Sequence, residues 1–311
     1  MKNTVEDEID LKELIEAILS GKWVIILVTL SLMVAAYFYA KSIPDQYTST
    51  AVLTSAAGSA SQSSFSGQLG GIASLAGVNL SGANGGKTVV ALELMKSWGF
   101  LEEFIRENKI DVQVYAAKGW DRNNNQLIID ESIYDVKSES WLVSSKDVVS
   151  GVNLEGPSSW ALFEKIKNRI KVTQDINTGF IYVSVEHFSP YVAKTWIDLL
   201  VSSINKKIQL RERKDALESI EYLKMQIGKT NIAEMKTVFY QLIEEQVKKL
   251  MLADISNEYV FKTLAPARVS EVKSKPKRSL IIVLVGFIGL ILSIVLVLIV
   301  HFVAKTNKSI A

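Results

Sequence analysis

The chain has no cysteine among its 311 residues and only two histidines, His187 and His301. The lack of cysteine excludes disulfides, a thiolate nucleophile and cysteine metal ligands. Neither His-Glu-x-x-His nor Gly-x-Ser-x-Gly occurs, so these signatures of metalloproteases and serine hydrolases are missing. No catalytic, cofactor-binding or metal-binding residue is predicted.

Carboxylates are plentiful, but most lie in predicted helices that are also rich in lysine and arginine, where pairing one turn apart explains them. Hydrolysis by two carboxylates remains open, although nothing singles out a pair. The net charge is only +2, which gives no reason to expect a nucleic-acid partner.

The stretch SGANGGKTVV, residues 81–90, looks like part of a nucleotide-binding P-loop. That motif needs glycine five places before the Gly-Lys-[Ser/Thr], whereas this chain has Ser81 there and a glycine one place late, at Gly82. A glycine-rich segment precedes it instead of a hydrophobic strand. We interpret it as a polar loop that leads into a helix.

Two long apolar runs stand near the ends of the chain, at residues 23–40 and 280–303. About 20 apolar residues cross a bilayer, so both qualify, the first with Trp23 and Tyr37 as interfacial anchors. The first run follows an acidic, amphipathic segment, unlike a signal peptide, which begins with a short basic region. We predict a two-pass membrane protein.

The positive charges around the two runs disagree about orientation. Lys12 and Lys22 precede the first run and only Lys41 closely follows it, which places the N-terminus in the cytoplasm. The basic residues before the second run, taken alone, would place the middle domain there. Because the first span usually dominates, we expect both termini in the cytoplasm.

Two sets of site residues follow from these spans. Lys275, Lys277 and Arg278 are candidate contacts to anionic lipid headgroups, at about 1 kcal/mol each. Small residues allow close helix contact in a membrane, and the second run contains three that are candidates for such packing. They are Gly286, Gly289 and Ser293.

Sequence patterns predict the elements between and around the spans. Helices are expected at 9–19, 88–107 and 158–170, and a serine- and glycine-rich mobile stretch at 55–86. Strands or strand ends are expected at 46–56, 112–117, 125–136 and 258–272, with a hairpin over 170–189.

The most unusual element begins at Ser189-Pro190, where proline suits the first helical turn. The helical pattern continues to about residue 226, too long for a compact domain, and a second helix is expected at 232–255. Either a helical hairpin or a bent long helix fits. The strand that follows could pair with the strand at 46–55.

The order of these segments resembles a known family, the Wzz-type polysaccharide chain-length determinants or polysaccharide co-polymerases of the bacterial inner membrane. The resemblance covers essentially the whole chain, although the segment before the second span has fewer prolines than the family usually has there. The similar stretches are IDLKELIEAILSGKW before the first span, PDQYTSTAVL after it, IASLAG, SPYVAKTW, and APARV followed by PKRSLIIVLVGFIG.

The resemblance implies an α+β membrane protein with two transmembrane helices, a periplasmic α/β base and a long protruding helix or helical hairpin. It implies a homo-oligomer in the form of a closed ring or bell. It implies no enzymatic activity. The expected partners are the inner-membrane polysaccharide polymerase, lipid-linked polysaccharide and the membrane. Residues 81–90 would lie in the periplasm, away from ATP.

The expected organisation divides the chain into five parts. They are a cytoplasmic amphipathic segment (1–22), the first span (23–40), a periplasmic domain (41–279), the second span (280–303) and a cytoplasmic tail (304–311). Within the periplasmic domain, 41–188 and 258–275 form the base and 189–256 the helical arm.

The expected function is to set the modal chain length of a surface polysaccharide, lipopolysaccharide O-antigen in particular. The alternatives are a co-polymerase for capsule or exopolysaccharide export, a two-span membrane sensor, and a periplasmic enzyme anchored at both ends. Four tryptophans could stack on sugar rings or instead form core and protomer contacts: Trp98, Trp120, Trp141 and Trp160.

Overall fold

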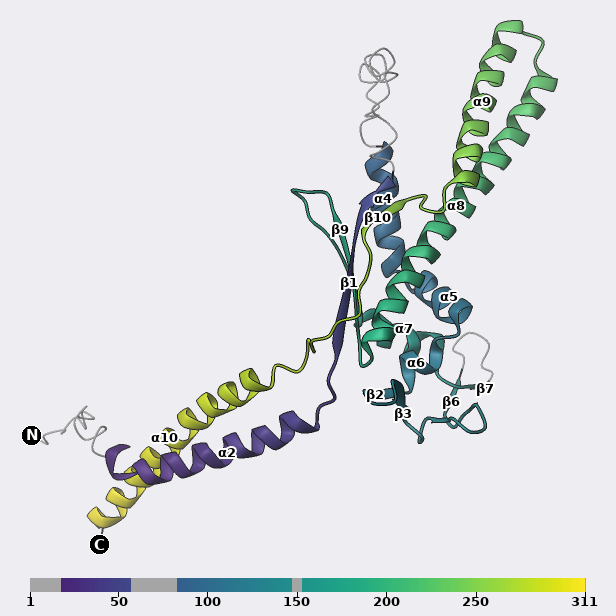
Figure 1. Cartoon of the computed structure of the whole chain (residues 1–311). Coiled ribbons are helices and arrows are strands. Elements are labelled where there is room, and N and C mark those ends of the chain that lie inside the picture. The colour runs from purple at the N-terminus through teal and green to yellow at the C-terminus, as the bar shows by residue number, and fades with distance from the viewer. Residues whose placement is uncertain (1–17, 57–82, 147–152, 311) are drawn as a thin grey trace, which may run out of the picture. The chain divides into compact units, whose positions relative to one another are not determined.

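The computed structural model describes residues 18–56, 83–146 and 153–310 (Figure 1). Within them the chain forms two compact units. The terminal unit contains the residues up to Asp45 and from Ser274 onward, and the central unit runs from Gln46 to Lys273. Of the amphipathic helix predicted at 9–19, only Ile18 and Leu19 are described, and both are helical. The rest of it and most of the serine- and glycine-rich stretch lie outside the described residues.

Helices α2 (Lys22–Ser42) and α10 (Arg278–Ile310) belong to the terminal unit, and they pack against each other. Both contain a segment long and apolar enough to cross a membrane, Lys22–Ser42 with mean hydropathy 2.1 and Arg278–His301 with mean hydropathy 3.3. Most of their large apolar side chains are exposed, as expected for helices whose solvent is lipid.

A four-stranded antiparallel sheet organises the central unit, in the order β10-β1-β9-β8. Its strands are β1 (Tyr47–Ser55), β8 (Ile170–Gln174), β9 (Ile181–His187) and β10 (Phe261–Ala265). The predicted hairpin is confirmed by the β8–β9 pairing, and the predicted pairing of the first strand with the returning strand by β1–β10.

One face of this sheet is buried. Ile181, Val183 and Val185 of β9 alternate with half-exposed residues and are fully buried, which is the pattern of a strand with one face on the core. Helix α8 (Pro190–Lys229) packs against β1 and β9. The core of the central unit therefore lies between the sheet and this helix.

Helix α8 is 40 residues long, about 60 Å at ~1.5 Å per residue. It begins where predicted, with Ser189 as N-cap and Pro190 in the first turn. Its first half is buried in the core, including Trp196, Leu200 and Ile204, but beyond Ile208 only Ala216 is buried. The second half pairs with α9 (Ala233–Ile255), so the alternative of a helical hairpin is correct.

The single helix predicted at 88–107 is wrong in one respect, because it is two helices, α4 (Ala83–Lys96) and α5 (Trp98–Asn108). The break is at Ser97, not at Gly99. The Ser97 hydroxyl accepts a hydrogen bond from the Phe100 amide and donates one to the Leu94 carbonyl at 2.7 Å. Serine thereby ends one helix and caps the next.

The strand or strand end predicted at 112–117 is also corrected, because Asp111–Tyr115 forms a short helix, α6. Val114 is fully buried, and α6 packs on α7 (Ser159–Lys167). Alternating valines suggested a strand, but this packing favours a helical turn. The described residues of this unit also form three small hairpins: β2 (Ala117–Asp121) with β3 (Gln126–Ile129), β4 (Tyr134–Asp135) with β5 (Ser140–Trp141), and β6 (Ser144–Lys146) with β7 (Asn153–Glu155).

A buried asparagine of α8 joins the returning chain to the core. The Asn205 side chain is 2% exposed. Its amide nitrogen donates to the Phe261 carbonyl at 3.0 Å, and its oxygen accepts from the Val260 and Phe261 amides, both at 2.9 Å. Every polar atom of the amide group is used, as buried polar groups require.

Replacing Asn205 by leucine should therefore destabilise the central unit. Leucine has a similar size but leaves buried backbone groups of Val260 and Phe261 without partners, at a cost of about 2–4 kcal/mol. The measurement is urea denaturation of the full chain in detergent, with tryptophan fluorescence as the signal of unfolding. Asn231→Leu, on the exposed turn between α8 and α9, is the matched control. Equal midpoints for both variants would contradict the role of Asn205.

Candidate functional site

The segment that resembles a P-loop is helical from Ala83 onward and forms no phosphate-binding loop there. The Lys87 ammonium pairs with the Glu212 carboxylate of α8 at 2.9 Å. The Thr88 hydroxyl is buried and donates to the Ser55 hydroxyl of β1 at 2.9 Å. The lysine and threonine that drew attention to the motif thus connect α4 to α8 and to the sheet.

The three small residues of the second apolar run lie along the contact between α10 and α2. A Cβ atom added to Gly286 would lie 3.1 Å from the Met33 side chain, and one added to Gly289 would lie 2.9 Å from Leu32. Ser293 is 1% exposed. Its hydroxyl oxygen lies 3.4 Å from that of Thr29 and donates to the Leu290 carbonyl.

Small residues and hydroxyl contacts are the features that let membrane helices approach closely. We propose that Gly286, Gly289 and Ser293 hold the two spans together in the bilayer. Gly21 adds a further close approach that sequence patterns did not indicate, because a Cβ atom there would overlap Val297.

Arg278 holds the start of α10 to the end of α2. Its guanidinium pairs with Asp45 at 2.8 Å and donates to the backbone carbonyls of Ala40 at 3.0 Å and Ile43 at 3.3 Å. A guanidinium at a helix C-terminus satisfies carbonyls that lack helical partners and interacts favourably with the helix dipole. The proposed headgroup contact of Arg278 therefore competes with this pairing, whereas the side chains of Lys275 and Lys277 are exposed.

The contact between the two spans can be tested with cysteines, since the native chain has none. Thr29→Cys combined with Ser293→Cys should form an internal disulfide with a membrane-permeable oxidant, because the two hydroxyl oxygens are 3.4 Å apart. Protection of both thiols from alkylation in the monomer band is the measurement. The control pair is Ser31→Cys with Ser293→Cys. Equal protection in both pairs would contradict the packing. Adding Gly289→Leu to the Thr29→Cys and Ser293→Cys pair should reduce the protection of its thiols.

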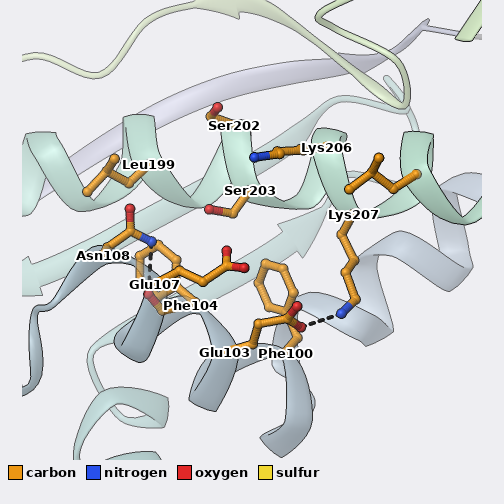
Figure 2. A pocket seen from close by; sticks show the side chains of 11 residues that line it. Phe100, Glu103, Phe104, Glu107, Asn108, Leu199, Ser202, Ser203, Lys206 and Lys207 are labelled. Carbon is orange, nitrogen blue, oxygen red and sulfur yellow. Dashed lines mark hydrogen bonds and ion pairs between the residues drawn. The ribbon is translucent and has the colours of Figure 1, made fainter. Parts of the chain in front are cut away.

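A polar groove lies between α5 and α8 in the central unit, with a volume of about 340 Å³ (Figure 2). Phe100 and Phe104 of α5 form part of its lining, with stacked rings whose centroids are 6.4 Å apart. The other lining residues are Glu103, Glu107, Asn108, Leu199, Ser202, Ser203, Lys206, Lys207 and Leu210.

Two of the four charged groups in the groove neutralise each other. The Lys207 ammonium forms an ion pair with the Glu103 carboxylate across the groove (Figure 2). Asn108 uses its amide nitrogen within α5, donating to the Phe104 carbonyl at 2.8 Å. Among the described residues, no hydrogen bond or ion pair of the Glu107 or Lys206 side chain is found. The groove thus presents one acid and one base to solvent.

The two histidines do not form a site. His187 is 1% exposed, lies against Trp196 with ring centroids 4.9 Å apart, and accepts at Nδ1 from the Ser189 amide at 3.1 Å. Burial, followed by the charge of Arg169, lowers the pKa of His187 from 6.5 to about 3. It is a neutral core residue at ordinary pH. His301 lies in α10, and no group of three metal-ligating side chains occurs among the described residues.

His187 should make stability depend on pH. Unfolding restores an ordinary pKa near 6.5, so between pH 6.5 and about 3 the unfolded chain binds a proton that the folded chain does not. The contribution of His187 to the free energy of unfolding is therefore greatest above pH 6.5. As the pH falls below that value, the free energy of unfolding decreases by up to ~1.4 kcal/mol per pH unit. His187→Gln should flatten that slope in denaturation midpoints measured from pH 4 to 7, and His301→Gln should not. An unchanged slope in His187→Gln would refute this account.

The four tryptophans fall into two groups. Trp120 packs edge-on against Tyr47, and Trp141 against Tyr134, so both belong to aromatic clusters. Trp98 and Trp160 are 45% and 53% exposed and contact each other edge-on, with ring centroids 5.6 Å apart. The Trp98 ring nitrogen donates to the Ser159 hydroxyl at 2.9 Å. This pair has the exposure that a protomer contact or a sugar contact needs.

One protein-family model matches part of this chain. Residues 7–108, about a third of the chain, match the Wzz family model, described as chain length determinant protein. The resemblance drawn from sequence is confirmed over these residues. A comparison with curated proteins finds no match.

Two similar solved structures are polysaccharide co-polymerases. A full-length bacterial polysaccharide co-polymerase has a TM-score of 0.39 and 11% identity, with 96% of this chain and 99% of that chain covered. A fragment of WzzB, a polysaccharide co-polymerase from Salmonella Typhimurium, has a TM-score of 0.26 and 10% identity, with 75% and 100% covered.

Proposed function

We propose that this chain, whose first third matches the Wzz chain-length determinants, is a non-catalytic regulator that sets the modal chain length of a surface polysaccharide. The polysaccharide in this proposal is lipopolysaccharide O-antigen. The regulator acts as a homo-oligomeric ring or bell together with the inner-membrane polymerase and its lipid-linked polysaccharide. The family match is the observation that carries the proposal.

The architecture supports this role. Two helices apolar enough to cross a bilayer precede and follow the large central unit in the sequence, and that unit carries a helical arm. In the proposal both termini are cytoplasmic and the central unit is periplasmic, where a growing polysaccharide would meet it. Lys275 and Lys277 would then contact lipid headgroups on the outer face of the inner membrane.

A non-catalytic mechanism depends on binding and geometry. The arm of α8 and α9 extends the surface of the central unit well beyond its core, and many of its large apolar side chains are exposed, including Tyr222, Tyr240 and Met251. Exposed apolar surface of this kind marks protein contacts. In the proposal these arms contact one another in the oligomer and determine how long a polysaccharide chain stays with the polymerase.

Deleting the gene should change the length distribution of surface lipopolysaccharide from a modal cluster to a smooth decay. Without the regulator, each addition of a repeat competes with chain release at a constant ratio. The measurement is a gel of lipopolysaccharide from cells with and without the gene, with the gene restored on a plasmid as control. An unchanged ladder would rule out the O-antigen role.

A second candidate is a co-polymerase for capsule or exopolysaccharide export, since the family match does not distinguish the polymer. The length of secreted polysaccharide from the same cells separates the two. A change there, with an unchanged lipopolysaccharide ladder, favours export. A change in neither would leave two alternatives, the two-span sensor and the periplasmic enzyme anchored at both ends.

A further inference from the structure

The groove between α5 and α8 contains polar groups that the fold does not use. Glu107 on α5 and Lys206 on α8 line it from opposite helices, and Ser203 faces the same space (Figure 2). In the described part of the chain, none of these three side chains has a hydrogen bond or an ion pair. Both helices are fixed by buried residues, Phe104 in α5 and Ile204 in α8. The groove is therefore preformed.

The charges in the groove favour an uncharged ligand. Glu103 and Lys207 already neutralise each other, which leaves one acceptor, Glu107, and one donor, Lys206. An anion would meet the free carboxylate and a cation would meet the free ammonium. A ligand that both donates and accepts hydrogen bonds, such as one with several hydroxyl groups, can satisfy the two walls together.

The shape of the groove agrees with this chemistry. Its volume of about 340 Å³ is near the lower end of the range for small-molecule sites, about 300–1,000 Å³. Apolar residues line it together with the polar ones, among them Leu199 and the buried Phe100. A sugar ring has hydroxyls around its edge and C–H groups on its faces, so it complements a groove lined by both polar and apolar side chains.

We propose that this groove binds a short, uncharged segment of the polysaccharide chain, with Glu107 accepting from sugar hydroxyls and Lys206 donating to them. The proposal rests on the proposed function, because that function supplies the polymer. Binding at this site retains a growing chain on the central unit. The α8 residues of the site lie in the part of α8 that packs on the sheet, and most of the part that pairs with α9 follows them in the chain.

The test measures binding directly. Arg211→Cys, at an exposed position beside the groove but outside its lining, provides the only thiol in the full-length protein and carries an environment-sensitive dye. The probe is the cell's own surface polysaccharide, released from lipid with mild acid. The control polymer is polyethylene glycol, which is uncharged but has no hydroxyl groups along its chain. We expect a saturable fluorescence change with the cell's polysaccharide and none with polyethylene glycol.

Two variants then test the assigned residues. Glu107→Ala and Lys206→Ala should each weaken binding about tenfold, as expected for loss of a hydrogen bond to a charged group. Glu102→Ala and Lys214→Ala, on the same two helices outside the groove, are the matched controls and should bind normally. Circular dichroism checks that all four remain folded, since alanine suits exposed helical positions.

Three outcomes would overturn the proposal. These are no fluorescence change with the polysaccharide, equal weakening by the control variants, and a change that follows protein concentration alone, which would make the groove a contact between copies. The outcome is independent of the deletion gel. If deletion alters chain length but the groove does not bind, only the groove assignment fails; if the groove binds but deletion has no effect, only the proposed function fails.

Discussion

The pairing of β1 with β10 is the interaction on which the rest of the central unit depends. These strands are the first and last of the unit, and their pairing closes it on itself. Asn205 holds the entry to β10 by three hydrogen bonds from the buried half of α8. Because a neighbouring strand pair and a buried amide fix the same segment, the returning chain has one position relative to the core.

The two halves of the long helix α8 are stabilised by different interactions. Its first half is stabilised by apolar burial against the sheet, and its second half relies on α9 and on charged pairs at the surface, such as Lys214 with Glu218. Surface pairs contribute little each, about 0–1 kcal/mol. A helix with a rigid base and a weakly held end can present an extended surface without needing a second core.

The proposed roles belong to different parts of this design. The terminal unit places two apolar helices side by side, with Arg278 joining the end of one to the start of the other. The central unit supplies the arm and the polar groove. None of these features depends on a perturbed catalytic group, and the strongly perturbed His187 is sealed in the core.

Sequence alone determined the features that depend on local or periodic patterns. These features are the two apolar runs, the alternation of Ile181 to Val185 and the start of α8 at Pro190. Each can be predicted from neighbouring residues alone, because solvent and backbone sterics act on those residues directly. Likewise, the missing first glycine argued against a P-loop.

Tertiary structure decided what depends on contacts between distant residues. The hairpin of α8 and α9, the helical turn of α6 and the Lys87–Glu212 pair each need a partner far away in the chain, which no local pattern specifies. The same holds for the groove, whose two walls are about 100 residues apart, as the Glu103–Lys207 pair shows. Its polar residues look like ordinary surface positions until α5 and α8 are brought together.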